Sequence, residues 1–83
     1  MRQKKISQKA SRLAVSDIAL GFDRERDELS LAAFLLRFTS PTVLDTIIPR
    51  LKDEEINATL DFLTGLIRRH LEEEEYHSLF LDE

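Results

Sequence analysis

The side chains most capable of chemistry lie near the end of the chain, in the stretch RRHLEEEEYHSLFLDE at residues 68–83. Glu74 and His77 form an E-x-x-H pair, a spacing that places two metal ligands on one helix face in di-iron and di-manganese bundles. A complete site needs a second such pair and two further glutamates, so a second copy of the chain would have to complete it. A carboxylate and histidine site completed by dimerisation is therefore one alternative. The favoured interpretation is a solvated helix end without metal ligands, because charge runs usually face water.

No other group of residues predicts a catalytic site. The chain has no cysteine, no glycine-rich phosphate loop and no G-x-S-x-G nucleophile motif. Ser78 follows His77, but adjacent residues on a helix point about 100° apart, so the two cannot act as nucleophile and base. We therefore predict that the protein is not an enzyme, has no catalytic residues and needs no cofactor.

Positive charge is concentrated at the start of the chain. The first twelve residues carry five basic side chains and no acid, whereas the rest carries 7 basic and 16 acidic residues. Such a basic arm can meet nucleic acid, an anionic membrane or the acidic end of a sister chain. A nucleic-acid-associated regulator is thus a second alternative, although the arm has no aromatic residue to stack on bases. Its contact residues would be Arg2, Lys4, Lys5, Lys9 and Arg12.

Composition predicts a soluble, cytoplasmic protein. The absence of cysteine is typical of a reducing compartment. No run approaches the roughly 18 consecutive apolar residues that a membrane span requires, and the basic start lacks the apolar core of a secretory signal. We therefore predict no membrane association.

Apolar residues recur at helical spacing, and only two glycines and two prolines interrupt the chain. We predict an all-α fold, a small bundle of four to five short helices with antiparallel neighbours. A flexible basic arm at residues 1–5 precedes one domain at residues 6–83. The predicted helices are 6–20, 24–38, 41–48, 53–70 and 72–80, with one unbroken helix from residue 53 to residue 80 as an alternative to the last two.

Capping residues support these boundaries. Gly21 is suited to a left-handed helix stop, and either Asp23 or Asp27 can accept hydrogen bonds from the amides that open the next helix. Pro41 suits a first helical position, where its missing amide has no partner to lose. Gly65, inside an apolar helical stretch, indicates a close helix crossing.

The helix at residues 24–38 is apolar on every side in its second half, so something must cover every side. Burial of one large apolar side chain contributes about 1.5–3 kcal/mol, and a chain this short has too little interior for all of them. We therefore predict a homodimeric interaction module, an adaptor, chaperone-like factor or regulatory subunit. It would bind an unidentified protein partner through an apolar groove rimmed by acidic residues. The predicted contact residues are Phe34, Leu35, Phe38, Tyr76, Leu79 and Phe80.

Overall fold

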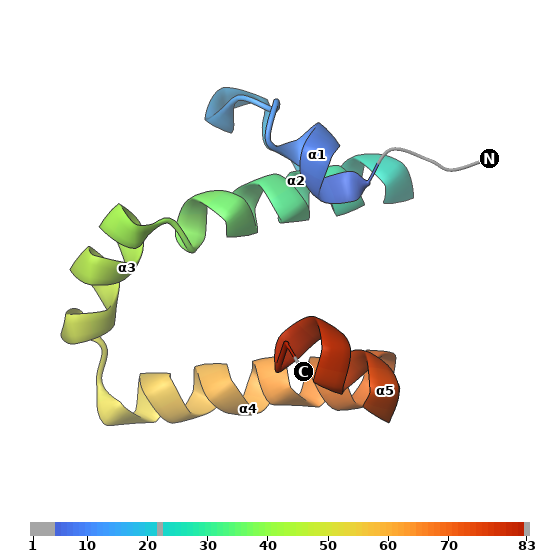
Figure 1. Ribbon diagram of the computed structural model, residues 1–83. Helices are drawn as coiled ribbons and strands as arrows, with labels where there is room; N and C mark the ends of the chain where they lie inside the picture. Colours follow the sequence, from blue (N-terminus) through green and yellow to red (C-terminus); the bar gives the residue numbers. More distant parts are fainter. Residues whose placement is uncertain (1–4, 22, 83) are drawn as a thin grey trace. The chain divides into compact units, whose positions relative to one another are not determined.

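The computed structural model describes residues 5–21 and 23–82, and within these ranges it contains helices and no strand (Figure 1). The all-α prediction is confirmed. The chain divides into two compact units, residues 1–49 and 50–83, which are described in turn. The single domain predicted for residues 6–83 stays a prediction. The α-helices are α1 (Ile6–Ala10), α2 (Arg24–Phe38), α3 (Pro41–Ile47), α4 (Asp53–His70) and α5 (Glu73–Glu75).

In the first unit, α1 packs against α2 through small side chains. Ala10, Ser30 and Ala33 are the buried residues among those described. Small side chains let two helix backbones approach closely, but they remove little apolar surface from water. The buried Ser30 hydroxyl accepts a hydrogen bond from the backbone N–H of Ala19 at 3.2 Å, which fastens the segment between the helices to α2.

The helix predicted for residues 6–20 is wrong beyond Ala10. The Ser11 hydroxyl donates to the Gln8 carbonyl at 2.9 Å, and such local bonds compete with continued helix. The next two amides, of Arg12 and Leu13, bond three residues back instead of four, which tightens the last turn. A short 3-10 turn, Val15–Asp17, then contacts α2, so this segment packs against α2 without forming one continuous helix.

Gly21 is not the stop of that helix, because the helix has already ended at Ala10. It does adopt the expected left-handed conformation, with φ at +89°. Its backbone N–H donates to Asp27 Oδ1 at 2.8 Å, which ties the loop to the first turns of α2.

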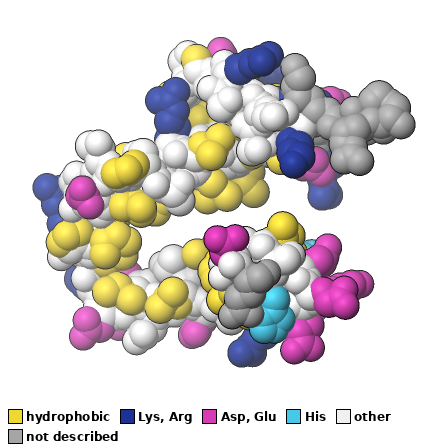
Figure 2. Space-filling view, viewed as in Figure 1, with side chains coloured by type: hydrophobic (Ala, Val, Ile, Leu, Met, Phe, Trp, Pro, Cys, Tyr) yellow, Lys and Arg dark blue, Asp and Glu magenta, His cyan; other side chains and the backbone are white. Residues whose placement is uncertain are grey.

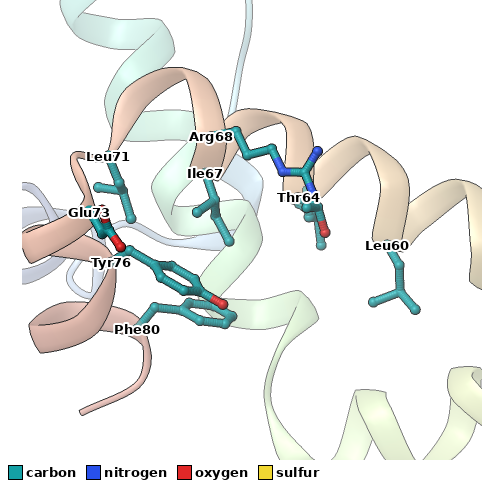
Figure 3. Close-up of a pocket in the computed structure, with 9 residues that line it drawn as sticks. Leu60, Thr64, Ile67, Arg68, Leu71, Glu73, Tyr76 and Phe80 are labelled. Carbon is teal, nitrogen blue, oxygen red and sulfur yellow. The ribbon is translucent and has the colours of Figure 1, made fainter. Parts of the chain in front are cut away.

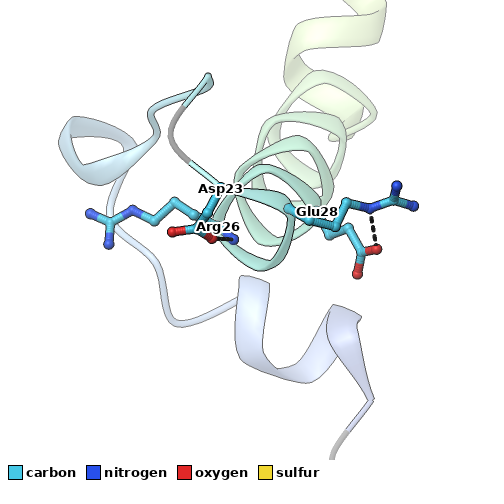
Figure 4. Close-up of polar contacts among 4 residues, drawn as sticks. Asp23, Arg26 and Glu28 are labelled. Carbon is cyan, nitrogen blue, oxygen red and sulfur yellow. Dashed lines mark hydrogen bonds and ion pairs between the residues drawn. The ribbon is translucent and has the colours of Figure 1, made fainter.

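Asp23 is the N-cap of α2, since its side chain accepts from the Arg26 backbone N–H at 2.8 Å (Figure 4). The Arg24 and Glu28 side chains form an exposed ion pair at 2.6 Å.

The short helix α3 begins as predicted, with Ser40 as its N-cap and Pro41 in its first turn. It ends at Ile47 and continues as a 3-10 turn, Ile48–Arg50, where Pro49 prevents a longer α-helix. No single helix among the described residues is long and apolar enough to cross a membrane. Within the part of the chain that the structure describes, α2 and the segment Pro41–Arg50 reach that length and composition only when taken together, as a pair bent by 70°.

In the second unit, α4 and α5 begin with the same kind of capping hydrogen bond. Glu55 accepts the Lys52 backbone N–H at the start of α4, and Glu75 accepts the Glu72 backbone N–H at the start of α5, each at 2.8 Å. Leu71, with ψ at 136°, separates the two helices, so the predicted break is confirmed and a single helix to residue 80 is wrong. A π-helical turn, Tyr76–Phe80, follows α5.

Candidate functional site

The helix α4 carries one apolar face. Ile56, Leu60, Leu63 and Ile67 recur at intervals of four, three and four residues, so they project from one side of the helix. Ile56, Leu60 and Leu63 are exposed, whereas Ile67, nearer the end of the helix, is partly covered. Within residues 50–82 no side chain is buried. The apolar face of α4 is therefore only covered at its C-terminal end.

The C-terminal turn supplies that cover. The Leu81 N–H bonds the Tyr76 carbonyl at 3.1 Å, five residues back, which gives the wide turn of a π-helix. The turn brings the rings of Tyr76 and Phe80 into a stack with centroids 5.6 Å apart and planes 14° apart. In Figure 3 the two rings lie side by side next to Ile67. A flat aromatic wall thus stands beside the apolar face of α4.

The space between this wall and α4 is a groove of about 620 Å³. Its lining is mostly apolar, and the polar side chains in it are Thr64, Arg68 and Glu73. Such a surface suits apolar side chains, because it offers few groups to orient a polar ligand. The apolar lining residues are Leu60, Leu63, Ile67, Leu71, Tyr76 and Phe80.

The unit that contains the groove carries a net negative charge. Residues 50–83 contain 4 Lys and Arg against 10 Asp and Glu, a net charge of −6. Glu72 to Glu75 are all exposed, and acidic side chains gather over α5 in Figure 2. A potential of this sign attracts a basic partner and repels an acidic one.

A second apolar surface lies on α2 in the first unit. Leu31, Phe34, Leu35 and Phe38 follow the spacing i, i+3, i+4, i+7 and form what we call the α2 stripe. Their exposed fractions range from 36% to 51%, and the Phe34 and Phe38 ring centroids are 6.1 Å apart. Within the first unit only the Ser30 and Ala33 side of this helix is buried, so that unit does not supply the cover predicted for its other sides.

The six predicted contact residues divide between the two units. Phe34, Leu35 and Phe38 belong to the α2 stripe, and Tyr76 and Phe80 line the groove. Leu79 is 70% exposed and is not part of the groove lining. The α4 side of the groove, Leu60, Leu63 and Ile67, was not among the predicted contacts. Its signal in the sequence is the apolar stripe that precedes the break at Leu71.

In the histidine and glutamate cluster, His77 contacts two neighbouring side chains. His77 Nε2 lies 3.9 Å from Glu73 Oε2, one turn earlier, and its ring meets the Tyr76 ring edge-on with centroids 5.8 Å apart. Within residues 5–21 and 23–82, no group of three or more potential metal ligands is brought together. His77 therefore contacts Glu73, one turn earlier, and the Tyr76 ring, and the pairing of His77 with Glu74 stays a prediction.

The basic residues of the arm are described in part. Lys5, Lys9 and Arg12 are exposed, with Lys5 directly preceding α1 and Lys9 within it. Arg2 and Lys4 lie outside the described residues. The described cations thus add positive charge to the surface of the unit that carries the α2 stripe.

Comparisons with models of protein families, with curated proteins and with solved structures found no match to this chain. The two exposed apolar surfaces, the groove and the α2 stripe, are the features of the described residues that bear on function.

Proposed function

We propose that the protein is a non-enzymatic, cytoplasmic interaction module that binds one amphipathic helix in the groove between α4 and the C-terminal turn. The observation that carries this proposal is the groove itself, about 620 Å³ in volume with a mostly apolar lining. Binding a helix in an apolar groove is a common mode of peptide recognition, in which side chains at i, i+3, i+4 and i+7 serve as anchors.

The chemistry of the partner follows from the charge around the groove. The net charge of −6 on residues 50–83 favours a helix whose flanking residues are basic. Arg68 and Glu73, which lie in the groove lining, can also fix the orientation of the bound helix through polar contacts. Apolar burial supplies the affinity, and charge supplies the selection of partners.

The lack of buried side chains in residues 50–82 supports association as the normal state of the protein. A segment of fewer than about 40 residues rarely folds alone without a disulfide, a metal or an oligomeric contact. Residues 50–82 contain no cysteine and no buried side chain, yet they form an amphipathic helix with a folded-back end. A homodimer in which apolar surface is covered is therefore part of the proposal.

The groove can be tested with a synthetic peptide in place of the unknown partner. The probe is a fluorescein-labelled helix of leucine and lysine about four turns long, with a leucine and glutamate peptide for comparison. Fluorescence anisotropy should show saturable binding of the lysine peptide. The glutamate peptide should bind at least about tenfold more weakly, because its charge matches that of the groove rim.

A matched pair of variants distinguishes binding in the groove from nonspecific binding to exposed apolar side chains. Leu63 lines the groove and is 46% exposed, while its neighbour Phe62 is 63% exposed and does not line it. Leu63→Gln should weaken binding of the lysine peptide about tenfold, since it removes an apolar contact worth at least about 1.4 kcal/mol. Phe62→Gln should bind like the wild type. Equal affinities for the two variants would show that the peptide does not use the groove.

A further inference from the structure

Two complementary apolar surfaces occur in the same chain. The ligand proposed for the groove is a helix with anchors at i, i+3, i+4 and i+7, and the α2 stripe has this spacing at Leu31, Phe34, Leu35 and Phe38. The stripe residues are at least 36% exposed, and Leu60, Leu63 and Phe80 of the groove are exposed as well. Each unit, taken by itself, therefore leaves an apolar surface in contact with water, and the stripe has the anchor spacing of the helix proposed for the groove.

Charge favours contact between unlike units. Residues 1–49 contain 8 Lys and Arg against 6 Asp and Glu, a net charge of +2, whereas residues 50–83 carry −6. Pairing two grooves would bring two strongly negative units together, and pairing two α2 stripes would bring two positive units together. Among these contacts between two copies, only the one that joins the stripe of one copy to the groove of the other brings opposite charges together.

We infer that the α2 stripe of a second copy is a ligand of the groove, and that two copies exchange these contacts reciprocally. This inference rests on the proposed function, because it names an occupant for the same groove. Reciprocal exchange has two-fold symmetry and closes after two copies, so it produces a dimer instead of an open filament. Each copy contributes α2 to the site of the other, and the site is incomplete without it.

The exchange has a consequence for partner binding. A partner helix and the α2 stripe of the second copy compete for one groove, so self-association lowers the apparent affinity for the partner. Binding of the partner in turn releases the stripe of the second copy. The dimer is then a resting form whose apolar surfaces are covered until a partner displaces one of them.

The absence of cysteine makes a cross-linking test specific. Leu35→Cys places a thiol in the stripe, and Leu63→Cys places one in the groove; both positions are exposed in the single chain. The two purified variants are mixed at micromolar concentration and treated with a short bis-maleimide. Linked heterodimers should exceed those of the control mixture roughly tenfold or more, because the contact holds the two thiols at a high effective concentration.

The control mixture uses neighbouring residues on other helix faces. Leu36→Cys lies on α2 outside the stripe, and Phe62→Cys lies on α4 outside the groove lining. Equal linking in the two mixtures would overturn the inference. Efficient linking of either the Leu35→Cys or the Leu63→Cys variant with itself would also overturn it, because that result requires stripe-to-stripe or groove-to-groove pairing.

A contact within one chain is a third possibility that the same reagents detect. The double variant Leu35→Cys/Leu63→Cys should give linked dimers at micromolar concentration and little linked monomer on dilution. Linked monomer that persists on dilution would overturn the inference in favour of an intramolecular contact. Circular dichroism of each variant verifies that its helical content is unchanged before linking is compared.

The outcomes separate this inference from the proposed function. If the leucine and lysine peptide binds through Leu63 but the stripe and groove variants do not link, the groove binds helices and the second copy is not one of them. If the variants link but the peptide does not bind, the groove is a self-association site without a preference for basic partners.

Discussion

At the scale of single residues, the two glycines have opposite roles. Gly21 has φ at +89°, a conformation that costs side-chain-bearing residues about 1–2 kcal/mol. A Cβ at Gly21 would meet no atom within 4 Å, so that cost is purely conformational. Gly65 lies inside α4, where a Cβ would meet the Arg69 side chain at 3.7 Å, an ordinary contact. Within the second unit the close helix crossing expected at Gly65 does not occur, because the atoms nearest to an added Cβ belong to the same helix.

This contrast predicts effects of opposite sign for one substitution. Gly21→Ala should lower the free energy of unfolding by about 1 kcal/mol, because it forces alanine into the left-handed region. Gly65→Ala should raise it by about 0.5–1 kcal/mol, because alanine loses less backbone entropy in a helix. Urea titration followed by circular dichroism measures both changes. Gly21→Asn serves as a control, since asparagine tolerates a positive φ, and it should be less destabilising than Gly21→Ala.

At the scale of helices, the boundaries set by local capping residues were predictable from the sequence. The boundaries set by side-chain hydrogen bonds that compete with continued helix were not. The start of α2 after Asp23, the start of α3 at Pro41 and the break after His70 all carry a side-chain signal within one turn. The end of α1 depends on a Ser11 hydroxyl bond that the sequence permits but does not require. The groove depends on the turn of the chain after Leu71. Tyr76 and Phe80 of its lining were among the predicted contact residues, whereas the α4 residues of its lining were not.

The cap of α2 gives a prediction at this scale. Asp23→Ala removes the acceptor of the Arg26 backbone N–H and should lower the free energy of unfolding by about 1 kcal/mol. Asp23→Asn keeps a side-chain oxygen in place and should stay within a few tenths of a kcal/mol of the wild type. Urea titration of the three proteins measures the difference. An Asp23→Ala variant as stable as the wild type would show that the Asp23 contact does not stabilise the start of α2.

At the scale of the whole molecule, the separation of charge between residues 1–49 and 50–83 makes association sensitive to salt. Exposed charges attract over about 10 Å at 0.1 M salt but over only about 3 Å at 1 M. The apolar contact inferred between the α2 stripe of one copy and the groove of another would not weaken in this way. We therefore expect the dimer to persist in high salt with a dissociation constant raised on the order of tenfold, as measured by sedimentation equilibrium.

The source of this salt dependence can be assigned with one variant. Lys9→Gln/Arg12→Gln removes two exposed cations from the first unit and leaves the α2 stripe intact, so the net charge of residues 1–49 falls from +2 to zero. At low salt this variant should dimerise more weakly than the wild type, and at 1 M salt the two should converge, because screening has already removed the same attraction. If the wild type instead dimerises more tightly as salt rises while the variant matches it throughout, two like-charged surfaces meet in the dimer. Exchange between unlike units would then be the wrong arrangement, even though apolar burial holds the two copies together.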